Sequence, residues 1–563
     1  MTFETIDYSP LRLLQEAALR HPGRRSLIWV RQNSTDLERC ETWNVAQSFA
    51  RVVTLAGLLR DWGVQPGARL AVIGKNSPWH LVTYAAAAAL PAVTVPLNWQ
   101  YPEAELAGVL AHCEPEVIFV DTDNHAKVAA ALSASGVEPR KVVEFTELAR
   151  WCAPPDTFLA TTPNTASDTS PTAGSAAGEA EPASGSPGSS GSPSALNLAL
   201  CMRRQLGSLP ICTDTTPGAI IYTSGTAASP KAALLTYKNL WWGCQNFREA
   251  FEYSPDCVEA VAAPLSHIGG FNGTTTDLFT NGGTVVVFEK FDPELVLRAI
   301  ERFRIQMMFG VPTMFRLLAD AAETGNYDTS SFTRALVGGA AWDTELAARV
   351  IALGWGPINI WGMTEQSASG ACLTSEVMAG REVGVGRAFP HIELRVTGKD
   401  GRPVPPGTIG QLECRGPSVT GQYFRDPELS AATIDPKTGW LKTGDLGVFD
   451  QDGFLRLRGR LSDTINTGGE KVFATKVAEA LAALPTVSEA AVVGVPDPKW
   501  GEAVGAVVVA KDAENPPPLA ELREAARARL APYELPRRLV IVPAIPLNSN
   551  GKPDRELLLA CFH

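Results

Sequence analysis

Residues 219–232 read Ala-Ile-Ile-Tyr-Thr-Ser-Gly-Thr-Ala-Ala-Ser-Pro-Lys-Ala, an apolar run that passes into a polar segment. The apolar part predicts a buried strand over 219–223. Similar apolar runs predict further strands, at 69–74, 92–97, 116–121, 284–289, 305–310 and 358–361. Helical patterns separate these runs, and strands of this kind are typical of sheets covered by helices on both faces. The sequence therefore predicts an α/β fold.

The polar segment that follows this strand has the chemistry of an anion site. Thr223, Ser224 and Thr226 carry hydroxyl groups that can donate hydrogen bonds. Backbone amides around Gly225 can form an anion-binding concavity, and Lys231 adds a mobile positive charge. The GxxxxGK[ST] pattern of a Walker A loop is absent. From these residues alone, a phosphate-binding loop and an ordinary Ser/Thr-rich surface turn are equally good interpretations.

Composition narrows the classes of protein. The chain has 563 residues, of which 45% are hydrophobic and 19% charged, and this excludes global disorder. Its formal net charge of -11, without a basic run, argues against nucleic acid and anionic membranes as partners. The 10 cysteines form no CxxC pair and no HExxH occurs, which argues against a zinc ribbon, a disulfide framework and a metallohydrolase. We expect a cytoplasmic protein without a membrane span.

Three stretches define the predicted organisation. The apolar stretch 81–97 contains Pro91 and several polar residues, and it predicts a buried helix followed by a strand. Residues 161–194 consist almost wholly of Thr, Ser, Ala, Gly and Pro, which predicts a disordered surface insertion. After residue 460 a compact α+β unit is predicted, with helices at 475–484 and 519–530 and strands at 490–494 and 504–510. The predicted domains are therefore 1–460, a large N-terminal domain, and 461–563, a small C-terminal domain.

Four further segments matter in combination. They are Asn-Ile-Trp-Gly-Met-Thr-Glu at 359–365, Gly-Trp-Leu-Lys-Thr-Gly-Asp at 439–445, Gly-Arg-Leu-Ser-Asp-Thr-Ile-Asn-Thr-Gly-Gly-Glu-Lys at 459–471 and Pro-Leu-Asn-Ser-Asn-Gly-Lys-Pro-Asp-Arg at 546–555. Taken singly, they could be a helix cap, a common turn or a solvated lysine. In this order, and together with 219–232, they resemble the motifs of the adenylate-forming superfamily, which includes acyl-CoA synthetases, peptide-synthetase adenylation domains and luciferases. The resemblance covers nearly the whole chain outside 161–194.

The resemblance implies a nucleotide site and a metal site. Trp361 would line the adenine, Asp445 would accept hydrogen bonds from the ribose, and Lys552 would be the catalytic lysine of adenylation. Glu365 and Thr226 would hold Mg²⁺. The full set implied to bind ATP is Thr223, Ser224, Gly225, Thr226, Lys231, Gly339, Ala340, Trp361, Gly362, Met363, Thr364, Asp445, Arg460 and Lys552.

The resemblance also implies an acceptor side and an acyl pocket. Gly468, Gly469 and Trp500 would bind coenzyme A, and Ser462 would be the hinge about which a mobile C-terminal domain rotates. His267 would gate the channel in which the acyl group and the thiol meet, although a buried, hydrogen-bonded histidine is the alternative interpretation. The implied acyl pocket consists of His267, Ile268, Phe271, Val311 and Met363, with Ala340 beside it. These side chains suit an aliphatic or aryl acid.

Some positions depart from the family pattern. Ala227, Ala228 and Ala232 replace residues of the YTSGTTGxPKG motif, Tyr237 stands where relatives usually have His, and Ser462 replaces Asp or Lys. An alanine at positive φ would cost about 1 kcal/mol, so we expect these alanines either to avoid that conformation or to make the loop stiffer.

The implied function is ATP-dependent activation of a fatty or aryl carboxylic acid to acyl-AMP, followed by transfer to coenzyme A. Segment 493–502 resembles that of stand-alone acyl-CoA synthetases, which favours coenzyme A as the acceptor. Two alternatives stay open: a ligase that transfers the acyl group to an amine or carrier protein, and a non-catalytic nucleotide-binding module. An NAD-dependent dehydrogenase is disfavoured because no GxGxxG follows an early strand. The sequence leaves open whether the chain forms a homodimer.

Overall fold

The computed structural model describes residues 6–153, 209–226, 229–340, 344–378, 384–548 and 553–562. The 161–194 segment, Ala227, Ala228 and Lys552 lie outside these residues, and only the backbone is described for 224–226. The described part of the chain contains four sheets. Two are large and mostly parallel, one is four-stranded and antiparallel, and one is five-stranded and mixed. This architecture confirms the predicted α/β class.

The six-stranded sheet contains the strand that leads into the polar segment. Its order is β6-β5-β3-β4-β7-β8, and only β7 and β8 pair antiparallel. Its strands are β3 (Arg69–Ile73), β4 (Val93–Leu97), β5 (Val117–Val120), β6 (Lys141–Glu144), β7 (Pro217–Thr226) and β8 (Ser229–Thr236). β4 and β5 are buried along their whole length, as expected for apolar strands between two layers of helices. The four strands predicted in this region are confirmed.

The polar segment differs from the prediction, which placed a loop directly after residue 223. β7 continues to Thr226 and β8 begins at Ser229, so the segment forms the end of a β-hairpin. Backbone pairing between the two strands forms this hairpin, and the polar side chains at its end lack the apolar alternation from which a strand is predicted. Ala232 lies in β8 and is not among the residues with positive φ, so it avoids the strained conformation.

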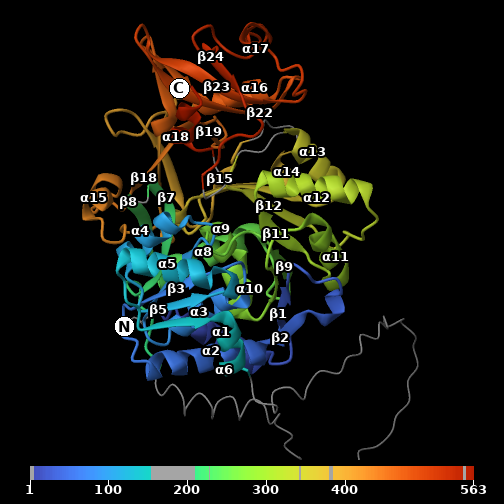
Figure 1. Cartoon of the computed structure of the whole chain (residues 1–563), viewed down its shortest axis with the longest axis vertical. Coiled ribbons are helices and arrows are strands. Elements are labelled where there is room, and N and C mark those ends of the chain that lie inside the picture. Colours follow the sequence, from blue (N-terminus) through green and yellow to red (C-terminus); the bar gives the residue numbers. More distant parts are fainter. Residues whose placement is uncertain are drawn as a thin grey trace, which may run out of the picture.

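The nine-stranded sheet has the order β15-β14-β13-β12-β11-β9-β10-β1-β2, and its strands are parallel from β13 to β1. Its strands are β1 (Arg25–Val30), β2 (Glu41–Asn44), β9 (Val258–Val261), β10 (Thr284–Phe288), β11 (Met307–Gly310), β12 (Arg334–Gly338), β13 (Pro357–Trp361), β14 (Ala371–Thr374) and β15 (Arg387–Ala388). The predicted strands at 284–289, 305–310 and 358–361 correspond to β10, β11 and β13. Because these strands run parallel, the carboxyl ends of β9, β11, β12 and β13 lie at one edge of the sheet. Figure 1 labels β9, β11 and β12 of this sheet.

Helices pack between and around these two sheets. They are α1 (Pro10–Arg20), α2 (Val45–Asp61), α3 (Pro78–Ala87), α4 (Glu103–Cys113), α5 (His125–Ser135), α6 (Phe145–Trp151), α8 (Tyr237–Phe251), α9 (Ile268–Phe271), α10 (Thr274–Asn281), α11 (Pro293–Phe303), α12 (Pro312–Thr324), α13 (Thr344–Ala352), α14 (Ser375–Met378) and α15 (Pro427–Thr433). All ten residues of α3 are buried, and β4 follows it, which confirms the helix and strand predicted within 81–97. No described helix is long and apolar enough to cross a membrane.

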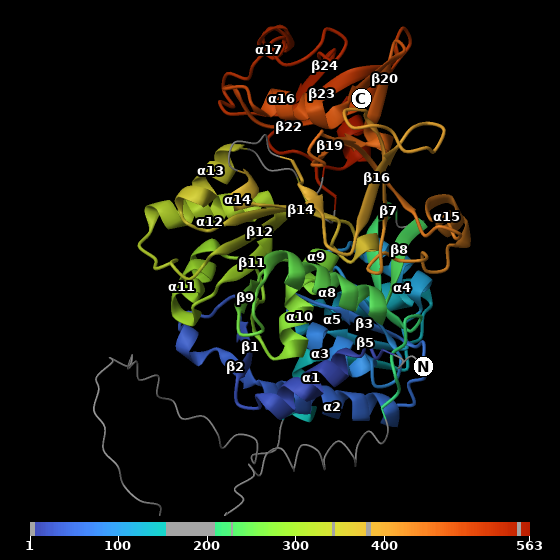
Figure 2. The same ribbon diagram turned by 180° about the vertical axis from the view of Figure 1, so that it is seen from behind.

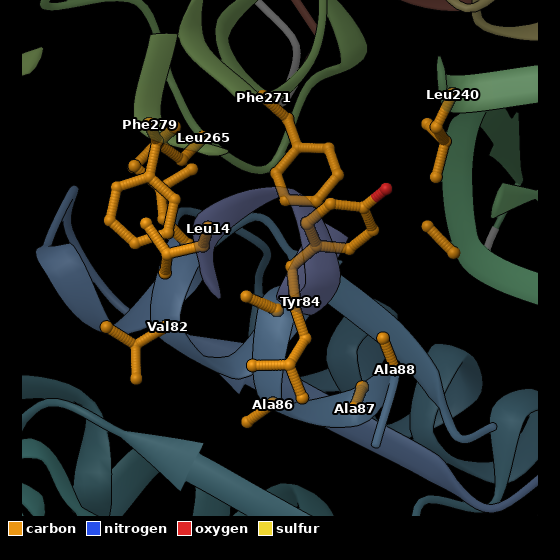
Figure 3. Packing of buried hydrophobic residues seen from close by; sticks show 14 of the residues in the cluster. Leu14, Val82, Tyr84, Ala86, Ala87, Ala88, Leu240, Leu265, Phe271 and Phe279 are labelled. Carbon is orange, nitrogen blue, oxygen red and sulfur yellow. The ribbon is translucent and has the colours of Figure 1, made fainter. Parts of the chain in front are cut away.

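The largest hydrophobic cluster contains aromatic side chains from α3, α8 and α9. Figure 3 shows Tyr84 of α3 directed at Phe271, and their ring centroids lie 5.2 Å apart. Tyr84 also packs on Tyr237, whose hydroxyl donates to the carbonyl of Ala92 at 3.2 Å. Tyr237, which stands where relatives usually have His, is fully buried and is part of the core.

The two remaining sheets follow one another in the chain. The antiparallel sheet consists of β16 (Glu393–Thr397), β17 (Gly410–Arg415), β18 (Leu441–Phe449) and β19 (Leu455–Arg460). The last sheet consists of β20 (Thr464–Thr467), β21 (Glu470–Phe473), β22 (Val487–Asp497), β23 (Gly501–Ala510) and β24 (Arg538–Ile541), with α16 (Ala474–Ala482), α17 (Leu519–Ala526) and α18 (Arg555–Ala560). Figures 1 and 2 place this sheet at the opposite end of the molecule from α1 and α2. The chain changes sheets between β19 and β20, and the exact domain boundary after residue 460 stays a prediction.

Candidate active site

The carboxyl ends of four neighbouring parallel strands carry several of the predicted residues. Glu365 follows β13, Gly339 follows β12, Val311 follows β11 and His267 follows β9. A Cβ atom built on Gly339 would lie 3.4 Å from Cγ1 of Val311, so these two positions are in contact. Ligands of open α/β sheets bind at this edge. The fold therefore gathers parts of motifs that are distant in the sequence.

Asp445, Arg460 and Trp361 form one hydrogen-bonded group beside this edge. Asp445 on β18 and Arg460 on β19 are direct partners in the antiparallel pair, and Arg460 Nε lies 3.2 Å from Asp445 Oδ1. Trp361 Nε1, at the end of β13, donates to Asp445 Oδ2 at 3.1 Å. The Asp445 backbone amide donates to the Thr443 hydroxyl at 3.0 Å. Asp445 is only 6% exposed. Three residues that were predicted from three separate motifs are therefore in contact.

Glu365 lies at the start of the short turn that follows β13. Gly362, Met363 and Thr364 precede it and are half-buried. Glu365 itself is buried, and the Tyr423 hydroxyl donates to its Oε1 at 2.7 Å. Burial raises the pKa of Glu365, while the hydrogen bond from Tyr423 and the charge of Arg460 act in the opposite direction. A buried carboxylate with a fixed donor is oriented in advance for a cation or a polar ligand.

Tyr423 belongs to a segment, residues 420–424, that connects Glu365 with β8. The amide of Thr420 donates to the carbonyl of Glu365 at 2.7 Å. The amide of Phe424 donates to the carbonyl of Ala232 at 2.8 Å, and Ala233 and Tyr423 form an antiparallel bridge. Sequence reasoning missed Tyr423, because a tyrosine in a polar stretch carries no signal of its own.

The β7–β8 hairpin carries the predicted phosphate-binding residues. Thr223 and Lys231 are direct partners in the antiparallel pair, and the Thr223 hydroxyl donates to the carbonyl of Lys231 at 3.4 Å. Lys231 is exposed, so its ammonium group is accessible. Residues 420–424 form backbone hydrogen bonds with both β8 and Glu365. They therefore link the strand that carries Lys231 to the predicted metal ligand.

The predicted acyl residues differ in their surroundings. His267 is half-buried, whereas Ile268 and Phe271 are buried in the core. Phe309, at the end of β11, was not predicted. Cβ atoms built on Gly269 and Gly338 would lie 2.6 and 3.0 Å from its ring, so the ring is in contact with both glycines. The only available signal was its position at the end of an apolar strand.

A buried amide fixes the turn that precedes His267. Asn76 Nδ2 donates to the carbonyl of Ala263 at 2.9 Å, and the amide of Leu265 donates to Asn76 Oδ1 at 2.8 Å. Asn76 follows β3, so this side chain joins the two large sheets at the base of the turn. Sequence reasoning did not single it out, because a polar residue after a strand is usually solvated.

The predicted acceptor residues lie in the C-terminal sheet. Gly468 and Gly469 are exposed, with φ values of +61° and +90°. The amide of Gly468 donates to the carbonyl of Trp500 at 2.8 Å, and the Arg537 guanidinium lies 4.2 Å from the Trp500 ring centroid. Ser462 is exposed between β19 and β20, and its hydroxyl donates to Asp463 Oδ1 at 2.9 Å. Gly468 and Trp500 are therefore neighbours, and their predicted role in binding coenzyme A stays a prediction.

Comparison with known proteins identifies the family of this chain. Residues 14–424 match the family model "AMP-binding enzyme", and residues 476–552 match "AMP-binding enzyme C-terminal domain". The chain is 33% identical to a feruloyl-CoA synthase of Amycolatopsis sp over 90% of this chain and 91% of the relative. It is 31% identical to the indoleacetate–CoA ligase of Aromatoleum aromaticum, with 91% of each chain covered.

Solved structures show the same fold. ATP-bound MatB from Rhodopseudomonas palustris is 25% identical with a TM-score of 0.77, and 99% of each chain is covered. The amide bond synthetase McbA from Marinactinospora thermotolerans is 28% identical, also with a TM-score of 0.77 and 99% coverage of each chain. With both family models matched, relatives aligned over nine-tenths of their length, and the motif residues gathered at one sheet edge, the chain belongs to the AMP-binding enzyme family of adenylate-forming enzymes.

Proposed function

We propose that this enzyme activates a carboxylic acid with ATP and transfers the acyl group to coenzyme A, releasing AMP and pyrophosphate. The observation that carries the proposal is the meeting of Trp361, Asp445 and Arg460 beside Glu365, in a chain that aligns over nine-tenths of the length of a feruloyl-CoA synthase and an indoleacetate–CoA ligase. The apolar residues at the predicted acyl pocket support an aryl or aliphatic acid, and the names of the two relatives favour an aryl acid.

In the first half-reaction an oxygen of the substrate carboxylate attacks the α-phosphorus of ATP, and pyrophosphate leaves. The Asp445 carboxylate accepts hydrogen bonds from the ribose, and Lys231 and Lys552 place positive charge near the phosphate oxygens. Their contribution is positioning and charge stabilisation, because the two reactants are both anions. Trp361, Gly362, Met363 and Thr364 line the nucleotide side of the sheet edge.

Glu365 fits a magnesium ion held mainly by the nucleotide. Its carboxylate is a hard oxygen ligand, and the Tyr423 hydroxyl orients it. Among the described residues no group of three or more potential metal ligands comes together. Mg²⁺, when bound, neutralises charge on the phosphate oxygens. The Thr226 side chain is the second predicted ligand.

In the second half-reaction the thiol attacks the acyl carbonyl and AMP leaves. We propose that the C-terminal sheet rotates about Ser462, which removes Lys552 and brings Gly468 and Gly469 to the acyl-adenylate. A short connection between two sheets supports such a motion. Trp500 borders the same loop and would contact coenzyme A. The predicted cytoplasmic location and a homodimer stay predictions.

The test is carboxylate-dependent exchange of pyrophosphate into ATP, followed by AMP release with each candidate acceptor. The acids are hydroxycinnamates, indoleacetate and fatty acids of several lengths, and the acceptors are coenzyme A, simple amines and a phosphopantetheinylated carrier protein. We expect exchange with an aryl acid and AMP release that accelerates only with coenzyme A. Acceleration by amines alone would overturn the choice of acceptor, and the similarity to McbA makes this the most informative control. Absence of exchange with every acid would overturn the proposal.

A further inference from the structure

Trp361 contacts the carboxylate that is proposed to bind the ribose. Its indole Nε1 donates to Asp445 Oδ2 at 3.1 Å, and Arg460 Nε lies 3.2 Å from Asp445 Oδ1. The three side chains come from β13, β18 and β19, and therefore from two different sheets. The Asp445 carboxylate is thus held at one oxygen by a neutral donor and at the other by a cation.

The indole ring has little freedom to turn. Trp361 is only 7% exposed and packs in a cluster with Leu412 and Leu455. On another side the ring lies against Gly370, where an added Cβ would come within 2.6 Å of Cε3 and Cζ3. The ring therefore occupies the space that a side chain at position 370 would fill. Its N–H is a preorganised donor, and reorienting it would require repacking of the cluster.

We propose that Trp361 is a positioning residue that acts through its indole N–H, which fixes the Asp445 carboxylate in the orientation that receives the ribose hydroxyls. This role differs from that of an aromatic surface for adenine, since a phenylalanine could supply such a surface but has no donor. The inference rests on the proposed function in one respect, the assignment of Asp445 to the ribose.

The experiment compares the binding of AMP and 2′-deoxy-AMP to the full chain by calorimetry. In Trp361→Phe we expect AMP to bind about tenfold more weakly, the size of one hydrogen bond to a charged group. We expect 2′-deoxy-AMP to be affected much less, so that the preference for the ribose form shrinks at least about fivefold. A purely structural loss would weaken both ligands equally, and an unchanged ratio of the two affinities would overturn the inference.

Trp355→Phe is the matched control. Trp355 is fully buried, and its Nε1 donates to the Thr329 hydroxyl, also at 3.1 Å. This variant loses an indole hydrogen bond of the same length, to a neutral hydroxyl and without touching Asp445, so its ratio of the two affinities should equal that of the wild type. If Trp361→Phe does not fold, benzothienylalanine incorporated at position 361 keeps the ring shape and removes only the N–H, and the same two outcomes apply.

Asp445→Ala separates failure of this inference from failure of the ribose assignment. If Asp445→Ala loses the preference for AMP over 2′-deoxy-AMP while Trp361→Phe retains it, the carboxylate binds ribose but does not depend on the indole. If Asp445→Ala itself retains the preference, the ribose assignment is wrong and the inference falls with it.

Discussion

Around Asp445 and Glu365, two buried carboxylates each accept a hydrogen bond from an aromatic side chain, whereas around Gly468 and Gly469 the chain exposes two glycines at positive φ. The first region is assembled from β13, β18 and the 420–424 segment, and its contacts span long stretches of sequence. The second is a turn between β20 and β21.

The difference reflects what each region has to do in the proposed reaction. A carboxylate that must meet a nucleotide in one orientation gains from partners that fix it before the ligand arrives. A loop that must admit a narrow thiol arm gains from the absence of side chains. The two regions should therefore fail in different ways when they are mutated.

The largest expected effect comes from Lys552→Ala. Because this lysine is proposed to act only in adenylation, carboxylate-dependent exchange of pyrophosphate should fall by about 10³-fold or more, whereas thioester formation from supplied acyl-AMP should stay within a few-fold of the wild type. Both rates are measured on one preparation. Equal loss of the two half-reactions would contradict the role given to Lys552.

Gly469→Leu should impair the function of the loop that contains Gly468 and Gly469 and leave the region around Asp445 and Glu365 intact. We expect CoA-dependent AMP release to fall by about 10²-fold while pyrophosphate exchange stays within a few-fold of the wild type, because small misplacements of a reacting group are costly. A Cβ at Gly469 meets no atom within 4 Å, so the first carbon of the side chain has room.

Gly407→Leu is the control for backbone strain. Gly407 has φ of +85° and an equally open Cβ position, and it lies in a turn of the antiparallel sheet. Its two half-reactions should both resemble those of the wild type. A matching loss of CoA turnover in Gly407→Leu would attribute the effect to backbone strain rather than to obstruction of the thiol arm.

Tyr423→Phe should have a smaller effect, in the region around Asp445 and Glu365. The change removes the donor to Glu365 Oε1 and keeps the ring, so the Mg²⁺ concentration for half-maximal exchange should rise about fivefold. Tyr533→Phe, at an exposed position of the C-terminal unit, is the control and should leave it unchanged. A wild-type Mg²⁺ requirement in Tyr423→Phe would show that Glu365 does not depend on this hydrogen bond.

The last effect concerns the stability of the sheet beneath the site and not the reaction. Burial raises the pKa of Glu259 on β9 to about 8, although the hydroxyls of Thr274 and Thr275 act in the opposite direction. A pKa raised on folding means that the native state retains a proton that the unfolded chain loses, so stability falls as the pH rises from about 4.5 to about 8. Through this group, the free energy of unfolding changes by at most about 1.4 kcal/mol per pH unit.

Glu259→Gln should remove most of this slope. Urea denaturation at pH 5, 6.5 and 8 would measure it, and we expect the variant to gain stability relative to the wild type as the pH rises. A constant difference between the two proteins across these three pH values would contradict the raised pKa.

Much of the fold could be predicted because local patterns determine it. Apolar runs gave the positions of β3, β4, β5, β10, β11 and β13, and α3 followed from the apolar stretch near residue 81. Asp445, Arg460, Glu365 and Trp361 were predicted as site residues through motif resemblance, not through chemistry that each residue displays alone.

The missed features depend on contacts between distant parts of the chain. Tyr423 and Glu365 are 58 residues apart, and Trp361 and Asp445 are 84 apart. Which strands become neighbours decides such pairs, and neither hydrophobic periodicity nor turn chemistry carries that information. The hairpin end at 224–226 was predicted as a loop for a related reason, because its polar residues form a strand only through pairing with β8.

The central claim is that the substrate carboxylate forms an acyl-adenylate, which the thiol then consumes. The most direct measurement uses an acid labelled with ¹⁸O in both carboxyl oxygens, together with ATP and coenzyme A, and mass spectrometry of the products. Attack on the α-phosphorus followed by thiol attack on the carbonyl transfers one ¹⁸O to each AMP and leaves one in the thioester. The account predicts this pattern. AMP without label, or label in inorganic phosphate, would contradict it.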